Sequence, residues 1–190
     1  MADSNITKRA LALALRELME EYPFDKIQVA HICEKCGMNR KSFYYHFKDK
    51  YDLLNWIFDT EIISFVQNFS KAGEQGQRIE IFQAACDYFY ENRSFYRKAL
   101  KIEGQNSFSG HFREYIMAIL KIRLADLIGD DADEFALNFF TDAVVGTVER
   151  WLLDKNCMPP DEFVARSLRL VQHGAEALNK ELNQEKADKG

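Results

Sequence analysis

Residues that interrupt regular structure are scarce in this chain of 190 amino acids. It contains only three prolines and nine glycines, which favours long helices over a sheet with many turns. No apolar run approaches the ~18 residues that a membrane-spanning helix needs, and the N-terminus carries no hydrophobic secretion signal. We therefore expect a cytoplasmic protein with no membrane segment.

Residue patterns typical of enzymes and metal sites are also missing. The sequence shows no Ser/His/Asp spacing, no phosphate-binding loop and no cluster with metal-ligand spacing. Its four cysteines suit reduced thiols better than a disulfide framework. Cys33 and Cys36 form a C-x-x-C pair, as in redox and zinc sites, but no second pair matches it. We interpret both as small core residues and predict no catalytic activity, metal or cofactor.

Charge of both signs is present, but it is unevenly distributed. The net charge of −5 argues against a protein that coats nucleic acid indiscriminately. Residues 1–50 hold nine Lys and Arg against seven Asp and Glu, whereas residues 51–190 hold sixteen against twenty-three. A mildly basic N-terminal part on an acidic body is compatible with DNA binding confined to the first 50 residues.

Apolar residues recur at helical spacing along the chain, and no segment alternates like a strand. In the first helix an apolar stripe runs from Ile6 to Leu18, and Pro23 ends the helix. The stretch from Asp131 to Glu134 has the pattern of a capping box before the penultimate helix. The sequence predicts two short helices within 29–47 and longer ones at about 4–22, 50–70, 78–91, 94–103, 107–128, 132–155 and 160–183.

The two short helices are separated by a glycine turn. Gly37 suits the left-handed conformation that ends a helix, and Phe43 and Phe47 lie four residues apart on the inner face of the second helix. The outward face of that helix carries donors for phosphates and base edges and no acidic residue. Its candidate DNA-binding residues are Arg40, Lys41, Ser42, Tyr44, Tyr45 and His46.

Residues 37–54, Gly-Met-Asn-Arg-Lys-Ser-Phe-Tyr-Tyr-His-Phe-Lys-Asp-Lys-Tyr-Asp-Leu-Leu, closely resemble the recognition helix of the TetR/AcrR family and its lead into the fourth helix. The most specific part is the Phe-Tyr-x-His-Phe core, followed by Lys48 and by a second lysine two positions later. This resemblance implies that the six outward residues face DNA and that Lys50 contacts a phosphate. Lys48 and Lys50 also flank a helix N-terminus, where a phosphate could bind to backbone amides.

The C-terminal half resembles the dimerising helix pair of many family members, from Phe139 to Leu152 and again from Met158 to Glu162. The stretch from Lys50 to Phe58 and the overall length are similar to the branch that contains activators of dihydroxyacetone kinase operons. The resemblance implies a homodimer formed by the last two long helices. The residues expected in that interface are Phe140, Val144, Trp151, Leu152, Leu168 and Val171.

Aromatic side chains are concentrated between residues 82 and 151. At helical spacing such residues belong to a core first, but large rings on slender helices also leave gaps. We expect an effector pocket that suits a neutral or weakly anionic small molecule. Its expected lining is Phe82, Tyr88, Phe89, Phe112, Tyr115 and Phe139, with Asn106 and His111 at its mouth.

These patterns together predict an all-α homodimer with two domains in each chain. Residues 1–50 form a three-helix head with a helix-turn-helix, and residues 51–190 form a helical bundle for effector sensing and dimerisation. The predicted function is sequence-specific regulation of transcription, with release from a double-stranded DNA operator by a small-molecule effector. Two alternatives remain open: an activator controlled by a partner protein docking on the C-terminal domain, and a helical ligand-binding protein with a non-functional head.

Overall fold

The computed structural model describes residues 2–70, 77–104, 107–128 and 133–173 of the chain, and their regular structure is entirely helical. The predicted all-α class is therefore confirmed. The named elements are α1 (Ala2–Glu21), the 3-10 turn η1 (Phe24–Lys26), α2 (Val29–Lys35), α3 (Arg40–His46), α4 (Lys50–Ser70), α5 (Gln77–Glu91), α6 (Arg93–Ala99), α7 (Phe108–Ile128) and α8 (Glu134–Leu153). Residues 160–173 form a further helix.

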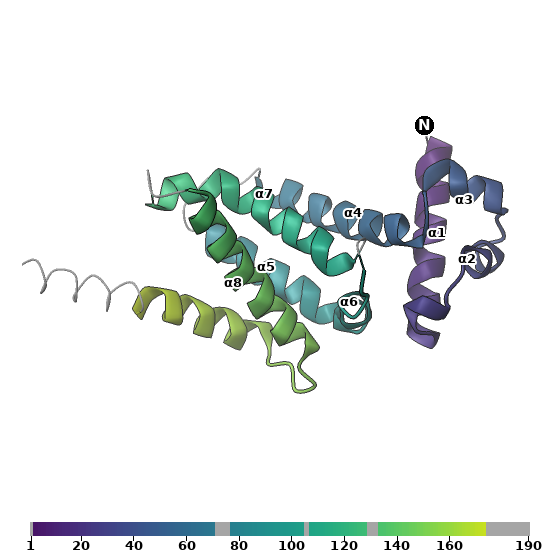
Figure 1. Cartoon of the computed structure of the whole chain (residues 1–190). Helices are drawn as coiled ribbons and strands as arrows, with labels where there is room; N and C mark the ends of the chain where they lie inside the picture. The colour runs from purple at the N-terminus through teal and green to yellow at the C-terminus, as the bar shows by residue number, and fades with distance from the viewer. Residues whose placement is uncertain (1, 71–76, 105–106, 129–132, 174–190) are drawn as a thin grey trace, which may run out of the picture.

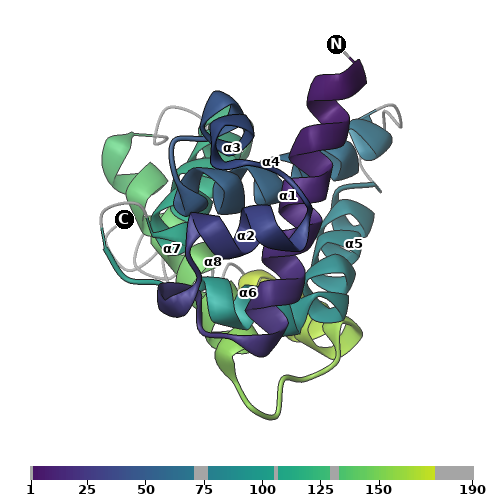
Figure 2. The ribbon, with the colours of Figure 1, turned by 90° about the vertical axis from the view of Figure 1, so that its right-hand side faces the viewer.

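The helices are arranged as a small head at one end of a longer body. Figure 1 shows α1, α2 and α3 gathered at one end, with α4 running from them into the body beside α7. Figure 2 views the molecule from the head, so that α2 and α3 lie in front of the body helices. This arrangement leaves α3 on the outer side of the head, where a large ligand can approach it.

The head has its own apolar core, which the short connection after α1 completes. Leu11 and Leu15 are fully buried, and Phe24 and Ile27 close the core from the segment that follows Pro23. The first helix begins at Ala2 rather than at the predicted Ser4. The predicted stripe was wrong at its start, because Ile6 is 64% exposed and the buried face begins one turn later.

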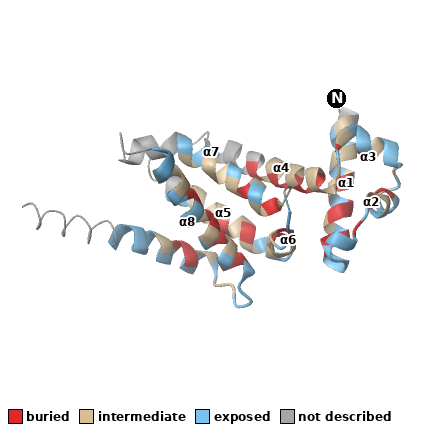
Figure 3. Ribbon diagram, in the orientation of Figure 1, coloured by how far each residue is buried: buried red, intermediate tan, exposed pale blue. Residues whose placement is uncertain are grey.

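Rings of aromatic residues build the core of the body. Phe58 of α4 lies at its centre and contacts the rings of Phe89, Phe108, His111, Phe112 and Tyr115, with centroid separations of 5.3–6.4 Å. Most of these contacts are edge-to-face, the arrangement that ring quadrupoles favour. In Figure 3 the buried residues of α4, α5 and α7 line the sides on which these helices face one another.

The two tryptophans of the chain lie in different parts of this fold. Trp56 of α4 packs on Phe47 from the head, with a centroid separation of 5.7 Å, and the ammonium group of Lys8 lies 5.6 Å from its ring. Trp151 of α8 stacks on Phe163 at 4.3 Å, and its Nε1 donates a 2.9 Å hydrogen bond to the carbonyl of Met158. Each tryptophan therefore has its own set of neighbours.

Helix boundaries in the body follow the expected signals with two differences: α6 ends at Ala99 rather than at about residue 103, and the cap of α8 is shifted. Asp133 caps α8, because its Oδ1 accepts a 2.8 Å hydrogen bond from the backbone N–H of Ala136. The capping role predicted for the stretch that starts at Asp131 is thus taken by Asp133, and Asp131 itself lies outside the described residues. Among the helices in the described ranges, none is both long enough and apolar enough to cross a membrane.

Candidate nucleic-acid interface

The turn between α2 and α3 is fixed by backbone geometry and by one side-chain cap. Gly37 has a φ of +69°, which confirms the predicted left-handed conformation. The Oδ1 of Asn39 accepts a 2.8 Å hydrogen bond from the backbone N–H of Ser42 and so caps α3. This cap was not predicted from the sequence, although an Asn just before a predicted helix is a recognised start signal.

Two buried aromatic residues hold α3 against the head and turn its other face outward. Phe43 and Phe47 are buried, and their ring centroids lie 5.9 Å apart. On the opposite side Tyr45 is 82% exposed and Tyr44 is 58% exposed. The remaining candidates are exposed or half-buried: Arg40, Lys41, Ser42 and His46. The helix Arg40–His46 thus presents hydroxyl, guanidinium and ammonium donors without a carboxylate.

The start of α4 is already occupied by carboxylates of this chain. The Oδ1 of Asp49 accepts hydrogen bonds from the backbone N–H groups of Tyr51 (2.8 Å) and Asp52 (2.9 Å). The Oδ2 of Asp52 accepts a 2.9 Å bond from the backbone N–H of Lys48. A phosphate at this helix N-terminus would meet two negative groups, which disfavours the predicted amide site. The side chain of Lys48 is exposed.

Lys50 does not point toward solvent, as the predicted phosphate contact requires. Its Nζ donates to the carbonyl oxygens of Phe24 at 2.6 Å and Ile27 at 2.7 Å, and the carbonyl of Asp25 lies at 3.4 Å. Burial lowers the pKa of the Lys50 ammonium below its usual value. An ammonium has three donors, and all three are directed at these carbonyls. In the free chain Lys50 is thus bound to backbone carbonyls, and the predicted phosphate contact would require these bonds to be exchanged.

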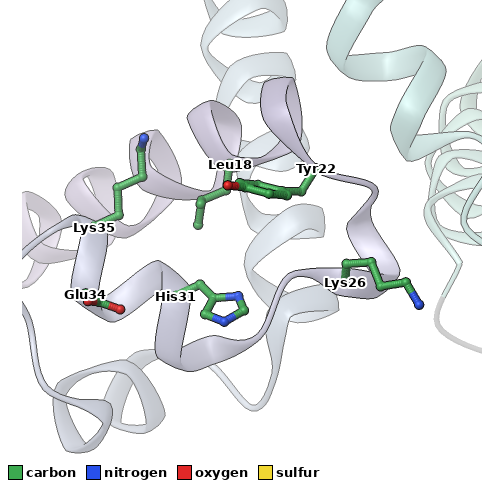
Figure 4. A pocket seen from close by; sticks show the side chains of 6 residues that line it. All are labelled: Leu18, Tyr22, Lys26, His31, Glu34 and Lys35. Atoms are coloured by element: carbon green, nitrogen blue, oxygen red, sulfur yellow. The ribbon is translucent and has the colours of Figure 1, made fainter.

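A shallow groove on the head lies away from these residues. Figure 4 shows its six lining side chains, which come from α1, the residue after it, η1 and α2, and none from α3: Leu18, Tyr22, Lys26, His31, Glu34 and Lys35. Lys35 pairs with Glu17 and Glu21 at 3.2 and 3.6 Å, so the groove has mixed charge. The ring Nδ1 of His31 accepts a 3.3 Å hydrogen bond from the backbone N–H of Gln28. His31 therefore supports the start of α2.

Arg16 connects the head to the body. It projects from α1 and forms an ion pair through Nη2 with Glu61 of α4, and its Nη1 donates to the Oδ1 of Asn92 at 3.4 Å. The guanidinium also lies 4.2 Å from the ring centroid of Phe95 on α6. The Nη2 of Arg16 also lies 3.5 Å from the hydroxyl of Tyr88, so one side chain of the head contacts α4, α5 and α6 as well as the residue that joins α5 to α6.

Glu61 is the centre of this polar network. Its Oε2 accepts hydrogen bonds from the hydroxyl groups of Tyr88 and of Tyr96, the latter at 2.9 Å, and the two hydroxyls lie 3.2 Å apart. Burial, and then the nearby Glu61 carboxylate, raises the pKa of Tyr96 well above its usual value, so its hydroxyl remains a donor. Nothing in the sequence pattern indicates that these residues meet, because Arg16 and Glu61 are 45 positions apart.

Replacing Arg16 by Met should destabilise the junction, because it leaves the Glu61 carboxylate without its counter-charge. Both side chains are about a quarter exposed, at 23% and 28%, which reduces the loss expected for a fully buried pair. We expect the free energy of unfolding in urea to fall by about 1–2 kcal/mol. Lys35→Met is the control, because its pairs with surface glutamates should contribute less than about 0.5 kcal/mol. Equal losses in both variants would contradict a special role for Arg16.

The residues predicted to line an effector pocket do not all converge. Phe89, Phe112, Tyr115 and His111 surround Phe58, and the His111 ring nitrogen Nε2 lies 2.7 Å from Oδ1 of Asp59. Tyr88 faces Glu61, whereas Phe82 contacts the ring of Phe163 at 6.4 Å. Phe139 is 59% exposed on α8, so its predicted place in an interior pocket is wrong for a single chain. Asn106 lies outside the described residues.

The predicted dimer residues divide into two groups. Trp151 and Leu152 are 5% and 2% exposed and belong to the core of the single chain, so their assignment to the interface was wrong. Both face the protein interior because Trp151 is stacked between Tyr90 and Phe163. The other four are exposed or half-buried: Phe140, Val144, Leu168 and Val171. Two exposed apolar neighbours were not predicted from the sequence, Phe135 at 77% and Leu170 at 75%.

The C-x-x-C pair packs as expected for core residues. Cys33 is buried, and the Sγ of Cys36 is 3.5 Å from the carbonyl oxygen of Cys33. Burial raises the pKa of both thiols, which disfavours the thiolate needed for redox exchange or metal binding. In the part of the chain that the structure describes, no three His, Cys, Asp or Glu residues are grouped closely enough to hold a metal ion.

Comparisons with known families match both ends of the chain. Residues 8–57 match the N-terminal region of the TetR family of bacterial regulatory proteins. Residues 77–173 match a C-terminal region of transcriptional regulators of the same family. The first match contains α2 and α3 with the whole outward face described above.

Individual proteins are similar to this chain in sequence or in fold. An activator of the dhaKLM operon from Lactococcus lactis, DhaS, is 29% identical over 104 residues, which are 54% of this chain and about half (54%) of the length of that protein. A TetR transcriptional regulator from Streptococcus agalactiae has a similar structure, with a TM-score of 0.67, 22% identity and coverage of 90% of this chain and 96% of its own. NalD, the secondary repressor of an efflux pump in Pseudomonas aeruginosa, has a TM-score of 0.60 and 17% identity, with coverage of 90% and 97%.

Proposed function

This chain belongs to the TetR family of bacterial transcriptional regulators, and we propose that it binds operator DNA by inserting α3 into the major groove. The observation that carries the proposal is the outward face of α3, where Arg40, Lys41, Tyr44 and Tyr45 are exposed together. Guanidinium and ammonium groups bind phosphates and guanine edges, and tyrosine hydroxyls bind phosphates as well. The helix is held by a buried inner face, so these donors have a fixed direction. We assign no catalytic activity to this chain.

The protein acts, in this proposal, as a homodimer with two heads. The supporting observation is the set of apolar side chains that the single chain leaves exposed on α8 and on residues 160–173: Phe135, Phe139, Phe140, Leu168, Leu170 and Val171. Burying such a surface against a second copy removes it from water. Two heads related by a two-fold axis reach successive major grooves when their α3 helices are about 34–36 Å apart.

We divide the chain, as a working proposal, into a head of residues 1–50 and a body of residues 51–190. The start of α4 at Lys50 supports this boundary. A small-molecule effector would bind to the body and would prefer the dimer conformation with one distance between the heads over the conformation with another. Its effect on DNA affinity could not exceed the difference between its affinities for these two conformations. We place the proposed effector site at the aromatic cluster around Phe58, where the rings pack closely and the His111–Asp59 pair lies at the edge, so a ligand would have to displace some of these contacts.

The direction of regulation has two candidate forms. The relative from Lactococcus lactis is named as an activator, whereas NalD is named as a repressor. In the first form, the chain is a repressor that a small-molecule effector releases from DNA. In the second form, an activator is controlled by a partner protein that docks on the body. The similarity to DhaS favours activation as the direction of regulation. The two forms differ in whether the purified protein alone loses DNA affinity when a small molecule is added.

Selection of binding sites from a random duplex library tests the proposed function and identifies the operator at the same time. We expect the purified protein to enrich one motif with two inverted half-sites, whose centres are about one helical turn apart. The bound complex should contain an even number of protein chains. A library that stays random after repeated selection would overturn the proposal and favour a helical ligand-binding protein with a non-functional head.

A further inference from the structure

The connection between α1 and α2, residues 19–27, is held by lysines from other parts of the chain; we call this segment the α1–α2 joint. The last carbonyl groups of a helix have no partner within that helix. Here Lys98 of α6 donates from Nζ to the carbonyl of Met19 and, at 2.8 Å, to that of Glu20. A body helix thereby satisfies the orphan carbonyls at the end of the first head helix.

The second half of the joint is held in the same way by Lys50. This residue is the first of α4, and its Nζ donates to the carbonyls of Phe24 and Ile27 at 2.6 and 2.7 Å. The ammonium also lies 4.4 Å from the ring centroid of Phe24, a cation–π distance. The carbonyls that it binds directly precede α2, whose first residue is Val29. The position of α2 therefore depends on where α4 begins.

We propose that Lys50 and Lys98 are positioning residues for DNA binding: they hold the α1–α2 joint so that α2 and α3 meet the DNA together, and neither lysine contacts DNA. The inference rests on the proposed DNA-binding function. Hydrogen bonds from an ammonium to carbonyl groups are charge-assisted and sheltered here beside Phe24 and Tyr51. A phosphate could recruit Lys50 only by breaking bonds to two carbonyls. Lys48, which is exposed, is the lysine of this region that faces solvent.

The salt dependence of operator affinity separates a positioning lysine from a phosphate contact. Each phosphate contact contributes about 0.9 to the slope of log K against log salt concentration. For Lys50→Met and Lys98→Met in the full-length protein, we expect operator affinity to fall about tenfold with the slope unchanged. For Lys48→Met we expect a slope smaller by about one. Lys155→Met, at an exposed position just after α8, is the control and should change neither quantity.

The conservative variant Lys50→Arg gives an independent readout. Arginine replaces lysine well at a phosphate, but its planar guanidinium does not match carbonyls that converge on one ammonium. We therefore expect Lys50→Arg to stay weak on the operator. Its affinity for random DNA should change little, so that the ratio of specific to non-specific affinity falls. Full affinity in Lys50→Arg, or a slope that drops by about one in Lys50→Met, would overturn the proposal.

Hydrogen exchange on the free protein tests the joint without DNA. We expect Lys50→Met to speed amide exchange in residues 22–33 several-fold, while the amides of α7 and α8 exchange as in the wild type. Unchanged exchange in that segment would overturn the proposal. Exchange that rises everywhere would show general unfolding and also count against a local role. This experiment separates the two failures: a protein that selects no DNA refutes the proposed function, whereas unchanged exchange in residues 22–33 refutes the role of Lys50 in holding the joint.

Discussion

Replacing Arg40 and Lys41 together by Ala should lower the affinity for the selected operator by about 100- to 1000-fold. Both side chains are exposed at the first turn of α3, so their loss removes DNA contacts without opening the core. A guanidinium on a base edge is worth about 1–3 kcal/mol of discrimination. A lysine on a phosphate adds affinity that does not depend on sequence. The measurement is a fluorescence-anisotropy titration at fixed salt, on the selected duplex and on random DNA.

A matched control removes two positive charges elsewhere. Lys101 and Lys155 are exposed and lie outside α3, so Lys101→Ala/Lys155→Ala changes the net charge equally. We expect this control to bind the operator within about twofold of the wild type, since charges away from the contact are screened by salt. If both double variants weaken binding equally, the affinity reflects net charge and the assignment of α3 as the recognition helix is wrong.

Introducing charges on the exposed apolar face should convert the protein into monomers. Phe139 and Val171 are 59% and 72% exposed in the single chain, so Phe139→Asp/Val171→Asp should leave each protomer folded. Each carboxylate would be desolvated in the dimer, with a penalty of several kcal/mol per ion. We expect a dimer in the wild type and a monomer in the variant by sedimentation velocity at micromolar concentration. Affinity for a two-half-site operator should fall about 100-fold or more, because the heads are no longer linked.

The control for the dimer experiment uses apolar residues of similar exposure on other surfaces. Leu13 on α1 and Ile79 on α5 are 58% and 52% exposed. Leu13→Asp/Ile79→Asp should remain dimeric with an unchanged circular-dichroism melt. A Phe139→Asp/Val171→Asp variant that sediments as a dimer would place the interface elsewhere. The proposal that α8 and residues 160–173 pair two chains would then have to be abandoned.

The helix-turn-helix could be predicted from the sequence because local rules determine most of it. A glycine with a left-handed requirement and two phenylalanines four residues apart each act within one or two helical turns. These features fix which side of α3 is buried, and therefore which side is exposed. The same local signals predicted the start of α4 at Lys50 correctly.

Features that depend on which distant residues a side chain contacts in the folded chain could not be predicted. The pattern of α8 is apolar on more than one side, and periodicity cannot tell that Trp151 packs inward on Phe163 while Phe139 faces outward. Lys50 shows the same limit, because its sequence neighbours do not reveal that carbonyls more than 20 residues away surround its ammonium. Distances between elements decide both cases, and they follow from the packing of the whole chain.

The separate surroundings of the two tryptophans make this protein its own optical probe. Trp56 touches Phe47 at the end of the DNA-binding unit, and Trp151 is stacked in the body. Substituting either one by Phe leaves a single tryptophan, which lies either at the contact between α4 and the head or inside the body. Emission from Trp56 would then follow events at the DNA, and emission from Trp151 would follow events in the body. The order in which the two signals change after rapid mixing would give the direction in which the protein passes information.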